Sequence, residues 1–466
     1  MTTAIQNVEN YLGSFTEFEK RATGRALPWL RQLRENAFAR FCETGFPTTH
    51  DEDWRFTNVS AIARTAFSPP QKGTLHLSNR DLNAWRTETT AAQLIFVDGQ
   101  FALELSDSSN LPERIVISSL KEQITKQSGT LKAHLGQYLD THRDSFCALN
   151  TAFAEDGAYV HVGRGRVLEA PIHLLFISTA ADKPRMIHPR NLIIVEDEGQ
   201  ATIIEEYVSL GTGIVFCNSA TELIAGENAT VAHHMMEREH TEAFNVSTLR
   251  IQQGRSANVA SHSILLGGGL VRNNVHPVLA GEGGECLING LFVGNGRQHL
   301  DNYMHVEHAS PHCSSRQFYN GILDGHAHGV FHGRIVVHKD AQKTDAKQTN
   351  RNLLLSDNAQ IDTKPQLEIY ADDVKCTHGA TIGQMEENAL FYLRSRGIDE
   401  ASARRLLLLA FAGECLERMK SGSARDHAER LIHEHLFAAS YGMPRQDVVD
   451  GNEQELQHAG SWEEVG

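Results

Sequence analysis

The sequence predicts a mainly β protein: a right-handed parallel β-helix core flanked by N-terminal and C-terminal helical regions. Between residues 145 and 375, short apolar segments rich in β-branched residues alternate with Gly, Asn and Asp turns. Within this region a small residue follows a turn at intervals of 28, 28, 29 and 28 residues. The residues at this repeated position are Ala201, Ala229, Ala257, Cys286 and Ser314.

A nearly fixed period of this length is typical of a solenoid, in which each repeat forms one coil and covers the apolar face of its neighbour. Strands rather than helices fill the period, which favours a β-helix. A β-sandwich or a cupin barrel is the alternative all-β fold, but neither requires a constant step.

Composition excludes several classes of protein. The chain has 466 residues, 41% hydrophobic and 22% charged, as expected for a globular protein of two or three domains. A formal net charge of −15 argues against a nucleic-acid partner. The N-terminus lacks the basic and apolar segments of a signal peptide, and the apolar run at 406–412 is too short to cross a membrane. We therefore expect a cytoplasmic protein without a membrane partner.

Cysteine spacing gives no metal or disulfide motif. The seven cysteines are scattered, odd in number and without a Cys-x-x-Cys pair. If the chain handles metal, we expect it to do so transiently or with ligands from a partner.

The flanking regions have helical patterns. Residues 15–44 form a predicted helix that ends at Gly45, and a polar loop anchored by Trp54 follows. Residues 92–118 resemble a hairpin with Asp98-Gly99 as its turn, and 119–139 are predicted to be helical.

Helices return near the C-terminus. A helix over 386–397 is predicted to end at Gly397, and Asp399 is a good N-cap for a second helix over 400–420. A third helix is predicted over 425–437. The resulting domains are a mostly helical 1–140, a β-helix core 141–375, a helical 376–442 and an acidic flexible tail 443–466.

Two enzyme classes remain open from the residues alone. A histidine-rich segment between His299 and His338 contains His326-Ala-His328, whose spacing would place two metal ligands on one face of a strand. Asp324, Asp340 and Asp345 could line the groove of a carbohydrate enzyme, although Asp is also common in turns. No P-loop, His-Glu-x-x-His or Gly-x-Ser-x-Gly motif is present.

The motif Cys376-Thr377-His378 lies where the β pattern gives way to the helical one. Side chains at i and i+2 of an extended segment point to the same side, so the thiol and the imidazole could face one site. The alternative is a buried thiol beside an ordinary strand-end histidine.

Three blocks of sequence resemble the SufB/SufD family of iron–sulfur cluster assembly proteins, and specifically its SufD branch. The blocks are 45–57, which ends in Trp-Arg-Phe-Thr; 149–172, which contains Asp156-Gly157; and 329–398, which contains Cys376-Thr-His378-Gly379. Gly379 and the lack of an N-terminal cysteine cluster favour SufD over a SufB-like paralogue.

The resemblance implies a non-catalytic scaffold subunit. It implies pairing with SufB through the β-helix, binding of the ATPase SufC through the C-terminal helices, and a homodimer when no partner is available. It places the functional histidine of the cluster assembly site at His378, as a transient metal ligand, with Cys376 in a weaker role. The residues that it assigns to the SufC-binding region are Leu390, Phe391, Tyr392, Arg396, Gly397 and Ile398.

For cofactors, the resemblance implies nothing tightly bound in the isolated chain and a transient iron or iron–sulfur cluster in the complex. It leaves open whether reduced flavin binds the complex and which iron source is used.

Overall fold

The computed structural model describes residues 2–70, 89–109, 111–179 and 182–438, together with residues 77, 82, 85, 87 and 441. The predicted acidic tail after residue 443 lies outside these residues. Within the described residues, no helix has both the length and the apolar character needed to cross a membrane.

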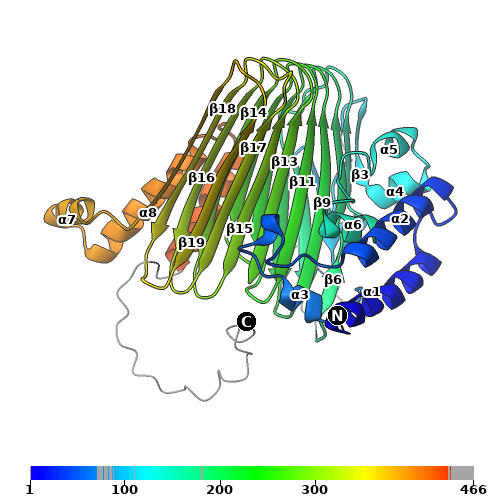
Figure 1. Ribbon diagram of the computed structural model, residues 1–466, viewed down its shortest axis with the longest axis horizontal. Coiled ribbons are helices and arrows are strands. Elements are labelled where there is room, and N and C mark those ends of the chain that lie inside the picture. The colour runs from blue at the N-terminus through cyan, green and yellow to red at the C-terminus, as the bar shows by residue number, and fades with distance from the viewer. Residues whose placement is uncertain are drawn as a thin grey trace.

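The helices gather at the two ends of the chain, with strands between them (Figure 1). The α-helices and short 3₁₀-helices are α1 (Thr2–Arg21), α2 (Pro28–Thr44), η1 (Glu52–Trp54), α3 (Ser60–Arg64), η3 (Leu103–Leu105), α4 (Leu120–Thr125), α5 (Gly129–His134), α6 (Ser145–Ala152), α7 (Glu387–Ser395), α8 (Glu400–Leu416) and α9 (Ser423–Ala438).

The first strands are β1 (Ala92–Val97), β2 (Gln100–Phe101), β3 (Ile115–Ser119), β4 (Ala158–Val162), β5 (Ile172–Thr179), β6 (Arg185–Ile187), β7 (Arg190–Val195), β8 (Gln200–Leu210), β9 (Val215–Ala225) and β10 (Thr230–Arg238). The later strands are β11 (Phe244–Gln253), β12 (Asn258–Leu265), β13 (Leu270–Leu279), β14 (Glu285–Gly294), β15 (His299–His308), β16 (Ser314–Leu323), β17 (His328–Val337), β18 (Asp345–Leu354), β19 (Gln360–Ile369) and β20 (Lys375–Gly383).

From β7 onward, successive long strands alternate between two parallel sheets, so the chain winds as a β-solenoid with two strands per coil. One sheet has the order β2-β1-β5-β8-β10-β12-β14-β16-β18-β20, and the other runs from β19 through the odd-numbered strands to β7, β4 and β3. This arrangement confirms the predicted parallel β-helix with helical flanks.

The repeat that led to this prediction is less regular than the sequence suggested. Hydrogen-bonded register aligns Gln200, Thr230, Asn258, Glu285 and Ser314, which are 30, 28, 27 and 29 residues apart. Ala229 and Ala257, each one residue before an aligned position, share a corner as predicted. Ala201 and Cys286 each lie one residue after an aligned position, so the sequence alignment placed them two positions away from the true equivalents of Ala229 and Ala257. The reason is that the coils differ in length, whereas the alignment assumed a nearly constant period.

A break separates the first two helices, whereas a single helix was predicted over residues 15–44. The chain turns at Gly24, whose φ is +73°, and α2 starts at Pro28. Proline favours the first turn of a helix, where its missing N–H is not needed. Gly45 closes α2 with φ +65°, as predicted.

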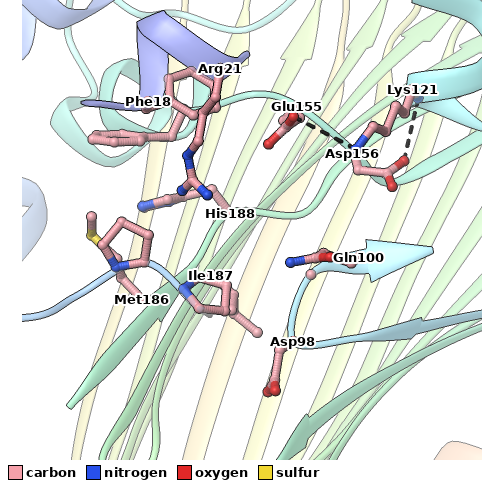
Figure 2. A pocket seen from close by; sticks show the side chains of 14 residues that line it. Phe18, Arg21, Asp98, Gln100, Lys121, Glu155, Asp156, Met186, Ile187 and His188 are labelled. Atoms are coloured by element: carbon pink, nitrogen blue, oxygen red, sulfur yellow. Dashed lines mark hydrogen bonds and ion pairs between the residues drawn. The ribbon is translucent and has the colours of Figure 1, made fainter. Parts of the chain in front are cut away.

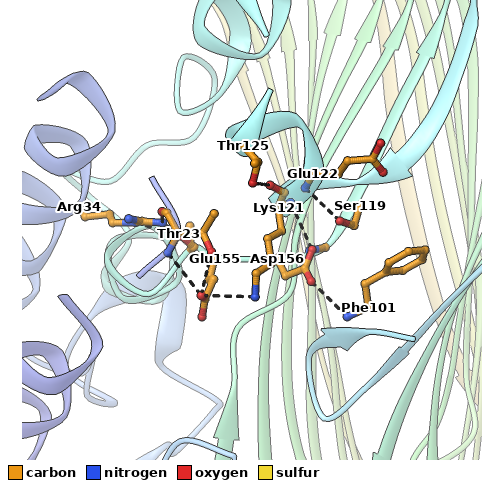
Figure 3. A network of polar contacts seen from close by, with 11 residues as sticks. Thr23, Arg34, Phe101, Ser119, Lys121, Glu122, Thr125, Glu155 and Asp156 are labelled. Atoms are coloured by element: carbon orange, nitrogen blue, oxygen red, sulfur yellow. Dashed lines mark hydrogen bonds and ion pairs between the residues drawn. The ribbon is translucent and has the colours of Figure 1, made fainter. Parts of the chain in front are cut away.

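Buried polar contacts fix these helices to the start of the solenoid (Figure 3). Arg34 of α2 is fully buried and donates to the carbonyl oxygen of Ala154 at 3.0 and 2.7 Å. Asp156 accepts from the backbone N–H groups of Phe101, Lys121 and Gly157. Burial raises the pKa of Asp156, and these backbone donors partly offset that effect.

The loop around Trp54 is the structural corner that the sequence predicted. Its indole ring stacks on Phe146 at 5.0 Å, and the guanidinium of Arg272 lies 3.8 Å from the ring centre. Thr57 donates to Asp301 at 2.6 Å, and Asp301 also pairs with Arg272 at 2.5 Å. These contacts hold the N-terminal region against β13 and β15.

The C-terminal helices α8 and α9 cover the outer face of the sheet that contains β8 and β14. Asn289 donates to the carbonyl oxygen of Cys415 at 2.8 Å, and His427 of α9 contacts Glu206 of β8 at 3.0 Å. Asp399 caps α8 by accepting from the N–H of Ser402 at 2.9 Å, as predicted.

The solenoid extends further than its predicted boundary at residue 375. Strand β20 runs to Gly383 and pairs in parallel with β18, so Cys376 and His378 belong to the last coil rather than to the helical region. The sequence did not predict the full length of this strand, because its glycine and threonine residues show no alternation of apolar and polar side chains.

Candidate functional site: the open end of the solenoid

The last coil ends both sheets. Strands β19 and β20 each have a parallel partner on one side, and within the described part of the chain neither has a partner on the other. Each therefore presents a row of free backbone N–H and C=O groups, which can pair with a strand of another chain. We call this surface, formed by β19 and β20, the open end.

Register fixes the direction of the two motif side chains. Cys376 lies beside Ala346 and His378 beside Gln348 on β18, and both β18 side chains are buried in the interior. Cys376 and His378 therefore share the inward side, as the spacing predicted, while Thr377 points to the other side. Because no further coil of the described residues covers them, they lie at the mouth of the interior.

The two side chains differ in their surroundings. His378 is exposed, whereas Cys376 is half-buried and packs against the main apolar core. Burial raises the pKa of the Cys376 thiol, which disfavours the thiolate, the form that binds metal. An exposed imidazole is a ready ligand for iron. Among the described residues, no three His, Cys, Asp or Glu side chains form a group that could hold a metal ion.

His378 continues a row of buried amides. Gln348 donates to Gln317 of β16 at 2.8 Å, and His378 is the next inward residue in this row. Sequence reasoning missed both glutamines. Their spacing, 31 residues from Gln317 to Gln348 and 30 to His378, matches the length of one coil and is the signal that could have found them.

Apolar side chains surround the motif at the open end. Ile361, Leu367 and Val374 are only partly buried and pack against the core from the last coil. Tyr370 is 63% exposed and Ile382 is 52% exposed. Exposed apolar residues beside unpaired strand edges are typical of a protein interface.

Helix α7 projects away from the solenoid beyond the end of α8 (Figure 1). It has no buried residue, and Phe391 and Tyr392 are 75% and 57% exposed. The Arg396 guanidinium lies over the Tyr392 ring at 5.1 Å. The structure thus brings the six residues assigned to the SufC-binding region together around α7, with Leu390 and Ile398 half-buried and Gly397 in the following turn at φ +87°.

The histidine-rich segment does not form the predicted pair of ligands on one strand face. His326 lies in a turn before β17, because Gly325 adopts φ +66° there, whereas His328 is in the strand and contacts Asp362 at 2.8 Å. Other histidines have separate partners: His308 bonds Ser315, and His332 bonds Gln366.

The three aspartates also lie apart from a common groove. Asp345 pairs with Arg316 at 2.7 Å at the start of β18, whereas Asp324 and Asp340 lie in turns.

A cavity of about 80 Å³ lies at the other end of the solenoid, between α1 and β6 (Figure 2). Its walls include Phe18, Phe153 and charged side chains. Three of those charged side chains are engaged in structural contacts: Asp98 pairs with Arg185 at 2.7 Å, and Lys121 lies 3.7 Å from Glu155.

The fold and the open end define a class of protein: a β-solenoid that exposes its terminal coil and a separate helical surface, as scaffold subunits do. Two family models cover almost the whole chain, namely the SufBD protein N-terminal region over residues 5–174 and the SUF system FeS cluster assembly SufBD core domain over residues 176–411. The chain belongs to the SufBD family and is SufD-like.

Relatives support this placement over most of the chain. An iron–sulfur cluster assembly SufBD family protein of Synechocystis sp. is 36% identical over 394 residues, which cover 83% of this chain and 86% of the relative. The iron–sulfur cluster assembly protein SufD of Escherichia coli is 30% identical over 90% of this chain and 95% of its own length. The SufD protein of Bacillus subtilis is 25% identical over 86% and 92%.

Proposed function

We propose that this chain is the SufD-type scaffold subunit of an iron–sulfur cluster assembly complex, and that its open end joins a SufB-type subunit at the assembly site. The observation that carries the proposal is the last coil, where two unpaired strand edges, exposed apolar residues and His378 occur together. A second β-solenoid could continue both sheets across this surface.

His378 would contribute one imidazole to the nascent cluster, which is the cargo of the complex. The remaining ligands would come from the partner, in keeping with the incomplete donor set on the described part of this chain. Cys376 would have a minor role, since its thiol is half-buried and its pKa is raised.

Helix α7 would be the docking element for the ATPase SufC. The proposal is supported by the exposed Phe391 and Tyr392, which lie on a helix that contributes nothing to the core. In this role the ATPase activity belongs to SufC, and the chain itself is not an enzyme.

When no SufB is present, the same open end would join a second copy of this chain. The unpaired edges and the apolar rim would then be covered in a two-fold dimer. The reduced flavin that the family resemblance leaves open would bind the complex rather than the isolated chain.

The test replaces His378 with Ala in the co-expressed complex. Because His378 is exposed and holds no structural contact among the described residues, we expect normal yield and complex formation. Cluster formation should be at least about tenfold slower, since even the loss of an outer-shell partner of a metal ligand typically costs about 10- to 100-fold. Thr377→Ala, on the opposite side of the same strand, is the matched control and should behave as wild type. Wild-type cluster formation by the His378 variant would refute the assigned role.

A further inference from the structure

Polar side chains line the middle of the solenoid's interior, where a solenoid normally packs apolar ones. His233 of β10 is an example: its inward neighbours Val231 and Met235 both belong to the apolar core, and it lies between them. The inward polar side chains of this stripe include Glu205, Thr221, His233, Ser247, Ser261, Ser263, Asn273, Asn302, Gln317, Gln348 and His378.

The stripe begins at a buried hydrogen-bonded pair. His233 contacts Glu205 at 3.0 Å, and both are almost fully buried. Glu205 also accepts from the Tyr207 hydroxyl at 2.5 Å and from Thr221 at 3.0 Å. A cavity of about 10 Å³ adjoins this pair and is also lined by Ser261, which leaves room for about one water molecule.

Many polar atoms of the stripe have no protein partner although they are buried. Within the described residues these include Ser219 Oγ, His233 Nδ1, Asn273 Nδ2, both amide atoms of Asn302, Gln317 Nε2, Gln348 Oε1 and Thr363 Oγ1. A buried donor or acceptor without a partner is costly, and ordered water is the usual partner where protein provides none. The atoms occur in coils from the inner cavity to the last one. Buried Ile288 separates Ser261 from Gln317 in one sheet, and buried Phe331 separates Asn302 from Thr363 in the other.

Two glycines make space for this stripe. A Cβ on Gly333 would lie 1.8 Å from the amide nitrogen of Gln348. A Cβ on Gly290 would lie 2.1 Å from the Tyr319 ring and 2.7 Å from Ser263 Oγ. Across Gly290, the Ser263 and Tyr319 hydroxyl groups bond at 3.1 Å, which connects coils on either side of β14. The interior therefore has room for polar groups at these two positions.

We propose that this stripe binds a file of ordered water molecules that connects the Glu205–His233 pair to the open end at His378 and carries protons between them. In each step, one water breaks an O–H bond and its neighbour forms one, so that one proton moves and no electron does. The role of this path in proton transfer rests on the proposed function. Metal binding by a thiol releases a proton. A partner bound to the open end would separate the assembly site from bulk water, so that proton would need another way out.

The first arm of the test is a high-resolution crystal structure of the isolated full-length chain. We expect ordered water beside His233, Asn273, Asn302 and Gln348. A dry interior with the same unpaired atoms would overturn the inference, whatever any variant does.

The second arm measures deuterium uptake at the imidazole carbon of His233 by mass spectrometry, since this exchange needs water at the ring. The variant Gln317→Met/Gln348→Met removes both partners of one hydrogen bond at similar volume, so it should remain folded. We expect uptake at His233 to slow at least about tenfold, because water must then enter by opening of the fold. Uptake at the wild-type rate would overturn the inference.

Matched controls keep this result specific. Gln360→Met makes the same chemical change on an exposed residue of β19 and should leave His233 unaffected. His262, buried on the outer face of β12, should exchange equally slowly in all three proteins. Both arms use the isolated chain, without a partner or a cluster. A negative result in them therefore does not bear on the His378→Ala test of the proposed function. A wild-type result in the His378→Ala test likewise does not bear on the water file.

Discussion

At the scale of the residue, Cys376 and His378 share a face but differ in reactivity. The imidazole is exposed at the mouth of the interior, whereas the thiol is half-buried against the core and its pKa is raised by burial. A raised thiol pKa means that the thiolate forms at higher pH than in a free cysteine, whose pKa is about 8.5. Exposure and the raised thiol pKa therefore both favour His378 over Cys376 as the proposed metal ligand.

This difference predicts how Cys376 reacts with iodoacetamide. Only the thiolate reacts, so the alkylation rate should be low at neutral pH and should still be rising above about pH 8.5. Peptide mass spectrometry would measure the rate at each pH in the isolated chain, with free cysteine as the reference. A rate that levels off below the midpoint of free cysteine would show that the thiol is activated instead.

At the scale of the element, α7 is a helix that buries none of its side chains fully. Its aromatic residues Phe391 and Tyr392 face solvent, while α8 and α9 pack on the solenoid through Leu408, Ala412 and Leu431. This exposed aromatic face is the surface that we propose SufC covers.

Phe391→Asp should therefore weaken SufC binding without changing stability. We expect a loss of about 2 kcal/mol or more, roughly a thirtyfold weaker Kd, as for an aromatic anchor at the centre of an interface. Calorimetric titration would measure it. Leu103→Asp is the matched control, because Leu103 is also 75% exposed but lies in η3, in the N-terminal part of the chain. Equal binding by wild type and the Phe391 variant would reject α7 as the dock.

At the scale of the whole molecule, a buried carboxylate joins the C-terminal helix α9 to the solenoid. Glu206 of β8 accepts from His173 at 3.1 Å, from His427 of α9 at 3.0 Å and from Arg238 at 3.0 Å. Burial alone would raise the pKa of Glu206, but these partners outweigh it and hold the pKa well below its usual value.

A lowered carboxyl pKa stabilises the fold at any pH above the unfolded value of about 4.3, and this stabilisation is lost as pH falls through the folded value. Glu206→Gln should lower the free energy of unfolding at pH 7 by about 3 kcal/mol, because it leaves the Arg238 guanidinium and two buried imidazoles without the carboxylate that they contact. Urea unfolding at several pH values should show that the gap to wild type narrows below about pH 4. A gap of constant size would contradict this account.

Much of the fold could be predicted from the sequence because its signals are local. The cap at Asp399 and the turn at Asp98-Gly99 depend only on neighbouring residues, and both are present, the latter with positive φ at both positions. The solenoid itself followed from repetition, although variable coil length shifted the alignment of Ala201 and Cys286.

What the sequence could not show depends on register between distant coils. Alternation marks the two faces of a strand but not which face is inward, so a buried Gln348 and an exposed Gln360 look alike. The polar stripe and the end of β20 became visible only when the strands were aligned. The roles of His378 and the α7 residues came from family resemblance rather than from their spacing.

The central claim is that the open end is the joint between two β-solenoid subunits. A photo-activated cross-linking amino acid at Ile382, which is 52% exposed on β20, tests it most directly in the co-purified complex. The account predicts a cross-link from this position to the SufB-type subunit, and none from the same group at Leu103. Cross-linking from Leu103 but not from Ile382 would contradict it.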